Sequence, residues 1–298
     1  MDELALENSE GRVVISPRAG ASLRSLRVRA PSGEFELIVG GDGPHDHASL
    51  PHGTGSFIMA PWPNRIRDGR LPASDGEHSL PVNSGVHAIH GLVREREWSV
   101  LERDETAATL AVDLESPWPY RGRVVYLVSL DGAALVQTMS IEAADGERPF
   151  PAGFGWHPWF RRSLGQGQMR LTAGVADQWQ MDETITPTGA VITPPLLDEM
   201  RAGAVFPPGA MDGCFRLGDG GRVTLEWPEV TLEMFSSPEL AHIQTYTPRP
   251  PLDHAICVEP QTCAVNAFQL AQQGFRGTGA ATVAPGNPLR ATTRWAWR

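Results

Sequence analysis

Residues 124–141 read VVYLVSLDGAALVQTMSI, and this stretch decides the fold class. Two runs rich in β-branched and other apolar residues, 124–130 and 135–141, flank the dipeptide Asp131-Gly132. A tight two-residue turn of the primed type requires positive φ angles, which aspartate and glycine tolerate. The stretch therefore predicts two antiparallel strands joined by a hairpin turn.

The period-two alternation of apolar residues continues on both sides of this hairpin, whereas long runs with the period of a helix are missing. The chain also contains 31 Gly and 26 Pro, which favours many short elements joined by turns. One segment, residues 264–273, has a helical pattern. Further strands are expected at residues 13–15, 35–39, 108–114, 223–227, 230–235, 243–246 and 290–297.

No internal repeat, charge block or linker-like tract divides the 298 residues, so we expect one all-β domain over residues 1–298. A long antiparallel sheet protects its edge strands by closing into a barrel or packing into a sandwich. Its concave face would suit a carbohydrate, because sugars offer both hydroxyl groups and flat C–H faces. The nine Trp beside only three Tyr agree with this idea, although core packing explains most tryptophans equally well.

The charge balance excludes several classes of function. The chain has 35 acidic against 25 basic residues, a net charge of −10, and every basic residue is Arg. An acidic surface repels phosphate backbones, so no nucleic-acid partner is expected. The lack of Lys excludes Schiff-base aldolases, pyridoxal-phosphate enzymes and nucleotide-binding sites of the P-loop type.

Cysteine usage and hydropathy predict a cytoplasmic protein. The odd count of Cys214, Cys257 and Cys263, with no Cys-x-x-Cys pair, argues against a disulfide framework or a zinc ribbon. Residues 1–10 are acidic and lack the apolar run of a secretory signal. No apolar stretch approaches the roughly 20 residues of a membrane helix, so no membrane partner is expected.

Six of the nine histidines fall between residues 45 and 90. The triplet His45-Asp46-His47 resembles half of the metal site of a cupin, but residues 48–53 contain no acidic residue to complete it. A loop with solvated imidazoles, His52 included, explains the cluster better. A metal-dependent cupin is the rival interpretation.

Two stretches in the first third of the chain carry candidate binding groups. In residues 60–69, APWPNRIRDG, two prolines precede the amide of Asn64 and the guanidinium of Arg65. A guanidinium recognises adjacent oxygen atoms well, although Arg65 could instead pair with Asp68 in a surface turn. Further on, His90 is followed by Gly91, which adds no side-chain bulk beside the imidazole.

Two later stretches carry candidate acid–base groups. His157 lies among aromatic and small residues in the stretch GFGWHPWF, residues 153–160, and Glu259 follows the apolar run 255–258. A carboxylate at the end of a strand that faces a cleft is a candidate base. A hydrogen-bonded core histidine and an ordinary rim carboxylate are the simpler interpretations of these two residues.

Taken together, these stretches resemble the aldose 1-epimerase (galactose mutarotase-like) family. The motifs occur in the order of that family and spread over the middle two thirds of the chain. The matching residues are Asn64-Arg65-Ile66 with Asp68-Gly69, His90-Gly91, His157 with the aromatic pair that follows it, Asp212 with Phe215, and Glu259-Pro260-Gln261-Thr262.

The resemblance implies a large antiparallel β-supersandwich that interconverts the α and β anomers of a free aldose without a cofactor or a metal. Glu259 is then the catalytic base that removes the proton of the C1 hydroxyl, and His157 is the acid that protonates the ring oxygen. Histidine suits this role because its unperturbed pKa is about 6.5. Each such proton transfer contributes about 10²–10⁴-fold to the rate.

The remaining candidate residues bind the substrate. The resemblance assigns Arg65, with Asn64 beside it, and His90 to oxygens near the sugar ring, and Asp212 to ring hydroxyls. We expect Trp62 or Trp159 to stack on the sugar face. The expected partner is a monosaccharide, bound by a monomer or a homodimer.

Two positions depart from the best-known galactose mutarotases and leave the preferred aldose open. Trp156 precedes the proposed acid where those enzymes usually carry Asn, and Leu92 stands where they commonly have a second Gly. A non-catalytic carbohydrate-binding module on the same scaffold is the alternative from another class. A glycosidase requires two carboxylates, for which only Glu259 and Asp212 are candidates.

Overall fold

The computed structural model describes residues 3–40, 53–218 and 221–298 of the chain. The predicted hairpin is confirmed: β12 (Gly122–Leu130) and β13 (Ala134–Ala143) pair antiparallel, with Leu130 opposite Leu135. Gly132 in the turn has a φ of 56°. Buried side chains alternate with more exposed ones along β12, so one face of this hairpin lies against the core.

Two large antiparallel sheets hold most of the strands. The larger has eleven strands, the second has eight, and three small sheets have two strands each. In spatial order the larger sheet consists of β1 (Leu4–Glu7), β2 (Gly11–Ser16), β3 (Ser22–Ala30), β5 (Ser56–Met59), β15 (Gly155–Arg161), β23 (Ala255–Gln261), β22 (His242–Tyr246), β19 (Asp212–Leu217), β17 (Val175–Met181) and β18 (Pro187–Ile192), with β4 (Gly33–Glu36) paired to β3. The second sheet consists of β10 (Ser99–Arg103), β11 (Ala107–Leu114), β12, β13, β25 (Leu289–Trp297), β21 (Thr231–Ser236), β20 (Arg222–Glu226) and β16 (Arg170–Ala173). The small sheets pair β6 (Arg65–Ile66) with β9 (Ala88–Ile89), β7 (Arg70–Ala73) with β8 (Gly76–Ser79), and β14 (Phe150–Ala152) with β24 (Ala281–Val283).

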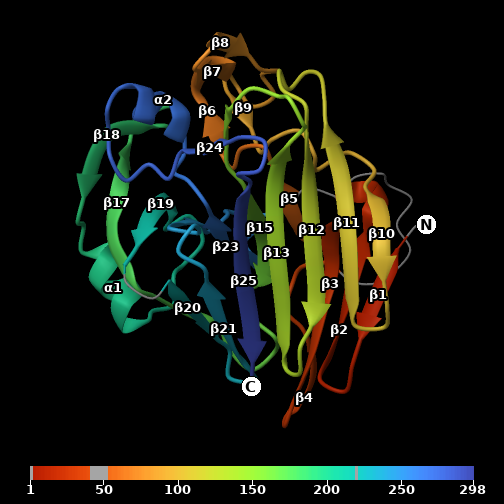
Figure 1. Ribbon diagram of the computed structural model, residues 1–298. Helices are drawn as coiled ribbons and strands as arrows, with labels where there is room; N and C mark the ends of the chain where they lie inside the picture. Colours follow the sequence, from red (N-terminus) through yellow and green to blue (C-terminus); the bar gives the residue numbers. More distant parts are fainter. Residues whose placement is uncertain (1–2, 41–52, 219–220) are drawn as a thin grey trace.

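The two large sheets pack face to face, so the expected sandwich is confirmed. In the view of Figure 1 the eight-stranded sheet lies in front of the larger sheet. Its strands β12, β13 and β25 pass in front of the strands of the larger sheet. Aromatic rings join the two layers: Tyr126 of β12 lies 6.5 Å from Trp156 of β15, and Phe160 of β15 lies 5.5 Å from Trp295 of β25. Such ring pairs stabilise a core beyond the area that they bury.

Strands β15 and β23 at the centre of the larger sheet are buried on both faces. Along β15, Trp156 and Phe160 belong to the main core, and Trp159 belongs to a separate small apolar cluster with Cys257 of β23. Because side chains alternate along a strand, His157 lies on the same face as Trp159, and Glu259 on the same face as Cys257. The face that is turned away from the sandwich core therefore carries both candidate acid–base residues.

The helices and one strand differ from expectation. The predicted helix at 264–273 is shorter, α2 (Ala267–Gln272), because Asn266 before it is left-handed with a φ of 55°. A second helix, α1 (Leu196–Ala202), was not expected; two prolines precede it, and a helix tolerates proline at its start. The strand expected at 35–39 ends at Glu36, and Ile38 makes only an isolated bridge to Phe160.

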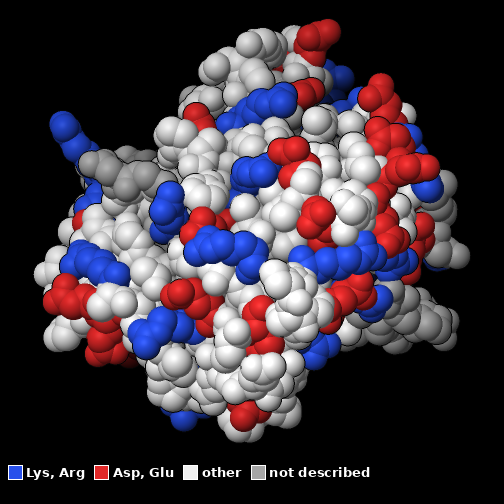
Figure 2. All heavy atoms as spheres, turned by 90° about the horizontal axis from the view of Figure 1, so that it is seen from below, with Lys and Arg blue, Asp and Glu red and all other residues white. Residues whose placement is uncertain are grey.

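Two further expectations concern the histidine cluster and the surface. His45, His47 and His52 lie outside the described residues. On the face shown in Figure 2, acidic and arginine side chains are interspersed and form no continuous basic surface. None of the helices that the structure describes is long and apolar enough to cross a membrane.

Candidate active site

His157 and Glu259 come together on neighbouring central strands. The register of β15 and β23 places Gly155 opposite Gln261 and Trp159 opposite Cys257, so the two candidates fall between these pairs. Their side chains are almost completely buried, and His157 Nε2 lies 3.3 Å from Glu259 Oε1. Two residues that are about one hundred positions apart in the sequence thus form a contact pair.

Aromatic neighbours fix the orientation of the imidazole. The His157 ring stacks on Trp159 at 5.4 Å with an angle of 13° between the planes, and on Phe57 of β5 at 4.4 Å with an angle of 29°. The His90 ring meets the His157 ring edge-on at 5.1 Å. Because the stacking contacts involve the faces of the imidazole ring, its nitrogens remain at the ring edge. One of them, Nε2, faces Glu259.

The carboxyl group of Glu259 experiences opposing influences. Burial raises its pKa well above the ordinary value of 4.5, and the negative charge of Asp212 raises the pKa further. The hydrogen bond that Gln261 Nε2 donates to Glu259 Oε2, at 3.0 Å, and the charge of Arg65 oppose this rise. A buried carboxylate with a raised pKa is a stronger base than an exposed one.

Gln244 links this pair to Asp212. It stands opposite Glu259 on β22, and its Nε2 donates a hydrogen bond of 2.8 Å to Asp212 Oδ1. Its Oε1 is buried and has no hydrogen-bond partner among the described residues, which leaves an acceptor for a ligand hydroxyl. No motif marked Gln244, but its place two residues before Tyr246 in the predicted strand 243–246 puts both on one face.

Arg65 lies on β6, and His90 directly follows β9 in the same small sheet pair. Arg65 pairs with Ile89, and the backbone N–H of His90 donates to the carbonyl of Asn64 at 2.9 Å. Asn64 and His90 have φ angles of 49° and 65°, which are uncommon for residues with a side chain and concentrate at functional sites. Arg65 does not pair with Asp68; its Nη1 donates to Asn64 Oδ1 at 3.1 Å. Burial raises the pKa of both Asp212 and Glu259, and the charge of Arg65 opposes that rise.

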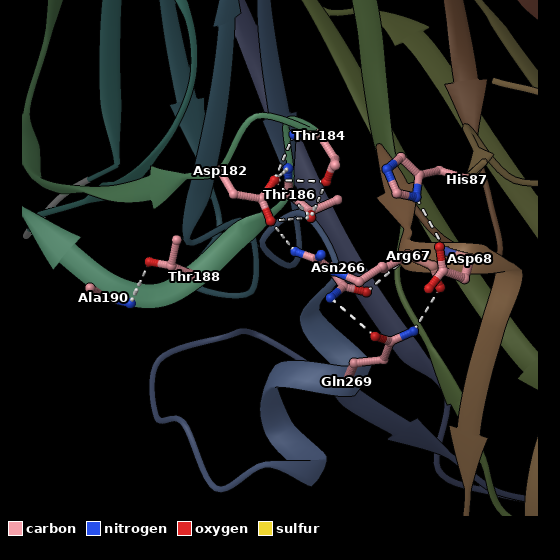
Figure 3. Close-up of polar contacts among 10 residues, drawn as sticks. All are labelled: Arg67, Asp68, His87, Asp182, Thr184, Thr186, Thr188, Ala190, Asn266 and Gln269. Carbon is pink, nitrogen blue, oxygen red and sulfur yellow. Dashed lines mark hydrogen bonds and ion pairs between the residues drawn. The ribbon is translucent and has the colours of Figure 1, made fainter. Parts of the chain in front are cut away.

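The segment after Arg65 is tied to two other parts of the chain (Figure 3). Arg67 forms an ion pair with Asp182 in the turn between β17 and β18. The backbone N–H of Arg67 donates to Asn266 Oδ1 at 3.0 Å, and Gln269 of α2 donates to the carbonyl of Arg67 at 2.8 Å. These contacts hold the Arg65 segment in a defined position.

The turn that Arg67 reaches is itself ordered around Asp182. Asp182 Oδ1 accepts hydrogen bonds from the backbone N–H and the hydroxyl of Thr184, at 2.8 and 2.7 Å. Ile185 in this turn has a φ of 58°, a strained conformation for a β-branched residue. Its side chain contributes an apolar surface to the cleft described next.

A cleft of about 430 Å³ unites these groups. Seven of the residues that the sequence singled out line it: Asn64, Arg65, His90, His157, Trp159, Asp212 and Glu259. Residues that sequence reasoning missed complete the lining: Asn83, Ser84, Ile89, Arg94, Ile185, Gln244 and Tyr246. Trp62 instead lies in the core and stacks on Trp118, so it does not face a ligand in this cleft.

The cleft has the size and chemistry of a sugar site. Its volume falls within the range of small-molecule pockets, and carboxylates, an amide and guanidinium groups converge on it beside an aromatic ring. An adjacent acid and base at its floor can move protons on one substrate group. His157 and Glu259, together with Cys257, also offer a set of atoms that a metal ion could bind.

Comparison with known proteins agrees with this picture. The family model described as aldose 1-epimerase matches residues 2–295 of the chain. The uncharacterized protein YihR of Escherichia coli (strain K12) is 27% identical over 233 residues, which cover 76% of this chain and 75% of that protein. The galactose mutarotase of Sus scrofa is 25% identical over 182 residues, which cover 58% of this chain and 52% of the pig protein.

Solved structures share the fold at low sequence identity. A galactose mutarotase-like protein from Clostridium acetobutylicum aligns with a TM-score of 0.84 and 18% identity, covering 99% of this chain and 94% of that one. A galactose 1-epimerase from Lactobacillus acidophilus aligns with a TM-score of 0.79 and 17% identity, with the same coverage. At this identity the likeness establishes the architecture.

Proposed function

Because the chain belongs to the aldose 1-epimerase family, we propose that it is a mutarotase that interconverts the α and β anomers of a free monosaccharide. The contact between His157 Nε2 and Glu259 Oε1, at 3.3 Å in the sugar-sized cleft, carries this proposal. The C1 hydroxyl and the ring oxygen of an aldose are bonded to the same carbon. A proton acceptor and a proton donor that lie side by side can therefore each reach one of these oxygens.

The reaction requires two coupled proton transfers. Glu259, in its ionised form, takes the proton of the C1 hydroxyl while the bond between C1 and the ring oxygen breaks and a carbonyl forms at C1. The electron pair of the broken bond stays on the ring oxygen, which takes a proton from His157. Rotation about the C1–C2 bond and reversal of both transfers then close the ring as the other anomer and restore both residues.

The other lining residues position the sugar. Arg65 and His90 stand next to the acid–base pair and would bind oxygens near the reacting carbon. Asp212 and Gln244 would hold hydroxyls farther along the ring, since Gln244 joins Glu259 to Asp212. Trp159 stacks on His157, so its contribution would be to orient the acid as much as to face the sugar.

A polarimetric assay tests the proposal. With freshly dissolved α-D-glucose and α-D-galactose, the protein should accelerate the approach to the equilibrium rotation. Glu259→Gln should lower the rate by about 10²–10⁴-fold, the usual contribution of one proton transfer. Glu229→Gln is the matched control, because Glu229 is also buried but lies outside the cleft and bonds the backbone of Gln166.

Three outcomes would contradict the proposal. Unchanged turnover in Glu259→Gln would refute the assigned base. Sugar binding by the wild-type protein without acceleration for any aldose in a panel would favour the non-catalytic binding module. Release of nitrophenol from nitrophenyl glycosides would favour a glycosidase that uses Glu259 and Asp212. The panel would also identify the preferred aldose, which Trp156 and Leu92 leave open.

A further inference from the structure

The floor of the cleft brings a third reactive side chain to the acid–base pair. Cys257 lies two residues before Glu259 on β23 and shares its face of the sheet. One ligand atom from each of His157, Cys257 and Glu259 lies within 4.8 Å of the other two. All three side chains are buried, and the reaction proposed above uses only His157 and Glu259.

The composition and spacing of this trio match the preferences of zinc. Zn²⁺ takes imidazole nitrogen, thiolate sulfur and carboxylate oxygen at about 2.0–2.3 Å, so neighbouring ligands of a tetrahedral site are about 3.3–3.8 Å apart. The separation of 3.3 Å between His157 Nε2 and Glu259 Oε1 already has this value. The 4.8 Å limit for the whole set means that a shift of about an ångström would close the site around an ion.

The surroundings also favour a divalent cation. The negative charges of Glu259 and Asp212 both act on the Cys257 thiol, although burial is the larger cause of its raised pKa. A divalent cation at this place stabilises the thiolate and both carboxylates together. The hydrogen bond from Gln261 to Glu259 Oε2 leaves Oε1 directed toward His157, as outer partners do for zinc ligands.

We propose that His157, Cys257 and Glu259 form a zinc-binding site at the floor of the cleft, and that Zn²⁺ bound there inhibits the protein. On binding, the Cys257 thiol and the protonated His157 each release a proton to solvent, the sulfur joins the ion, and the freed His157 Nε2 and Glu259 Oε1 supply two further ligands. The fourth position faces the cleft. The ion thereby occupies both groups of the proposed acid–base pair and competes with the sugar.

Metal binding can be tested without any assay of activity. Co²⁺ reports on such sites, because a cobalt–thiolate bond gives a charge-transfer absorption band in the near ultraviolet. We expect the full-length protein to develop this band with Co²⁺ and to lose it when Zn²⁺ is added in equal amount. Cys257→Ala should lack the band, whereas the matched variant Cys263→Ala should retain it, because Cys263 is equally buried but belongs to another apolar cluster.

Inhibition is the second measurement, and it depends on the proposed function. Zn²⁺ should slow mutarotation competitively with the sugar, and EDTA should restore the rate. In Cys257→Ala the apparent inhibition constant should rise by at least about tenfold, since even the loss of an outer partner of a zinc ligand costs 10–100-fold in affinity. Its activity without metal should stay near that of the wild type, because the thiol takes no part in the proton transfers.

The cobalt titration tests the metal site, and the assay of mutarotation tests the proposed function, so each can fail without the other. Absence of the cobalt–thiolate band in the wild type, or an unchanged band in Cys257→Ala, would overturn the metal site whatever the protein catalyses. A band without any mutarotation would retain the site and reject the proposed function. If Cys257→Ala does not fold, Cys257→Ser provides the same comparison, with far-ultraviolet circular dichroism as the check.

Discussion

At the scale of single residues, the chemistry of this cleft depends on how Glu259 is kept available as a base. Burial and the neighbouring charge of Asp212 favour its protonated form, while Gln261 and Arg65 favour the carboxylate. A carboxyl group with a raised pKa accepts a proton from a sugar hydroxyl more readily, but it is ionised only above that pKa. The flanking residues therefore determine the pH at which the base becomes active.

The first prediction concerns the acid limb of the pH–rate profile. Activity should fall as the pH decreases through the raised pKa of Glu259, so the midpoint should lie above 4.5, the ordinary value for Glu. Asp212→Asn removes a like charge and should move the midpoint to lower pH. Gln261→Leu removes a hydrogen bond to the carboxylate and should move it to higher pH.

The measurement is the rate of mutarotation against pH at saturating sugar, with EDTA present to exclude metal. The position of the midpoint is diagnostic, because a loss of sugar binding in Asp212→Asn changes KM and leaves the midpoint unaffected. Shifts of both variants in the same direction would contradict the assigned electrostatics. The observed midpoint belongs to the coupled groups of the cleft and not to Glu259 alone.

Sequence and structure agree well at this scale, for a definite reason. His157 and Glu259 stand in short motifs that resemble those of a known family, and the register of β15 and β23 places them opposite each other. Gln244 was missed because an isolated glutamine in a strand has no distinctive neighbour, and only the register with Glu259 shows its position. Trp62 was misjudged because an aromatic residue near a binding motif can equally turn toward the core.

At the scale of elements, the site depends on loops whose backbone angles the sequence does not specify. The segments that flank β6 and β9 contain positive φ angles at Asn64, Asp68 and His90. Glycine is the residue that normally marks such positions, as Gly69 and Gly91 do here, but it cannot mark the three positions that carry other side chains. The motifs could therefore be recognised, whereas the turns that bring Arg65 and His90 together could not.

Gly91 offers the second prediction. It has a φ of 70°, and a Cβ added there would lie 2.0 Å from the carbonyl oxygen of Ala60. Gly91→Ala should destabilise the protein by about 3 kcal/mol or more, through both backbone strain and steric overlap. Because His90 is adjacent, the variant should also lose most of its activity under conditions in which it is still folded.

Gly132→Ala is the matched control for this experiment. Gly132 also has a positive φ, 56°, but a Cβ there meets nothing within 4 Å. The substitution should cost only about 1–2 kcal/mol, the penalty for an L-residue in the left-handed region. Equal losses of unfolding free energy in the two variants, measured by urea denaturation, would show that the contact with Ala60 is unimportant.

The third prediction concerns the ion pair between Arg67 and Asp182. Arg67→Gln should loosen the turn that carries Ile185 and the segment that carries Arg65, both of which line the cleft. We expect KM to rise roughly threefold to tenfold, equivalent to about 1 kcal/mol, with little change in kcat. Arg67 itself is not among the residues that line the cleft.

Arg294→Gln provides the comparison for Arg67→Gln. Arg294 forms an ion pair of 2.7 Å with Asp131 in the β12–β13 turn, away from the residues that line the cleft. Its loss should leave both kinetic constants unchanged. A decrease in kcat without a change in KM for Arg67→Gln would reject a role in positioning the substrate.

At the scale of the whole molecule, the sandwich follows directly from the period-two pattern. Each sheet buries one face against the other, and most apolar residues of both sheets belong to one continuous core, from Leu4 in the first strand to Trp297 in the last. Pattern alone predicted an all-β chain and a layered or closed arrangement. It could not give the strand order, in which β5, β15 and β23 are neighbours, because such pairings join distant segments and depend on packing.

The shared core leads to the last prediction, that residues 1–298 unfold as one cooperative domain. Leu26 of β3 and Leu135 of β13 are fully buried, one in each sheet. Replacing either by Ala leaves a cavity in the same core and should lower the unfolding free energy by about 2–5 kcal/mol. Leu127→Ala on β12 should change it by less than about 0.5 kcal/mol, because that side chain is 43% exposed.

Calorimetry and urea denaturation should show one transition in all three variants, shifted in the two core variants and followed equally by tryptophan fluorescence and circular dichroism. If the sheets were separate folding units, Leu26→Ala would shift one transition and Leu135→Ala another. The cleft lies on the outer face of the larger sheet, and β15 of its floor packs directly on the second sheet. A core substitution in the second sheet should therefore abolish mutarotation only where the whole molecule unfolds, and a loss of activity at lower urea would show that the cleft opens independently.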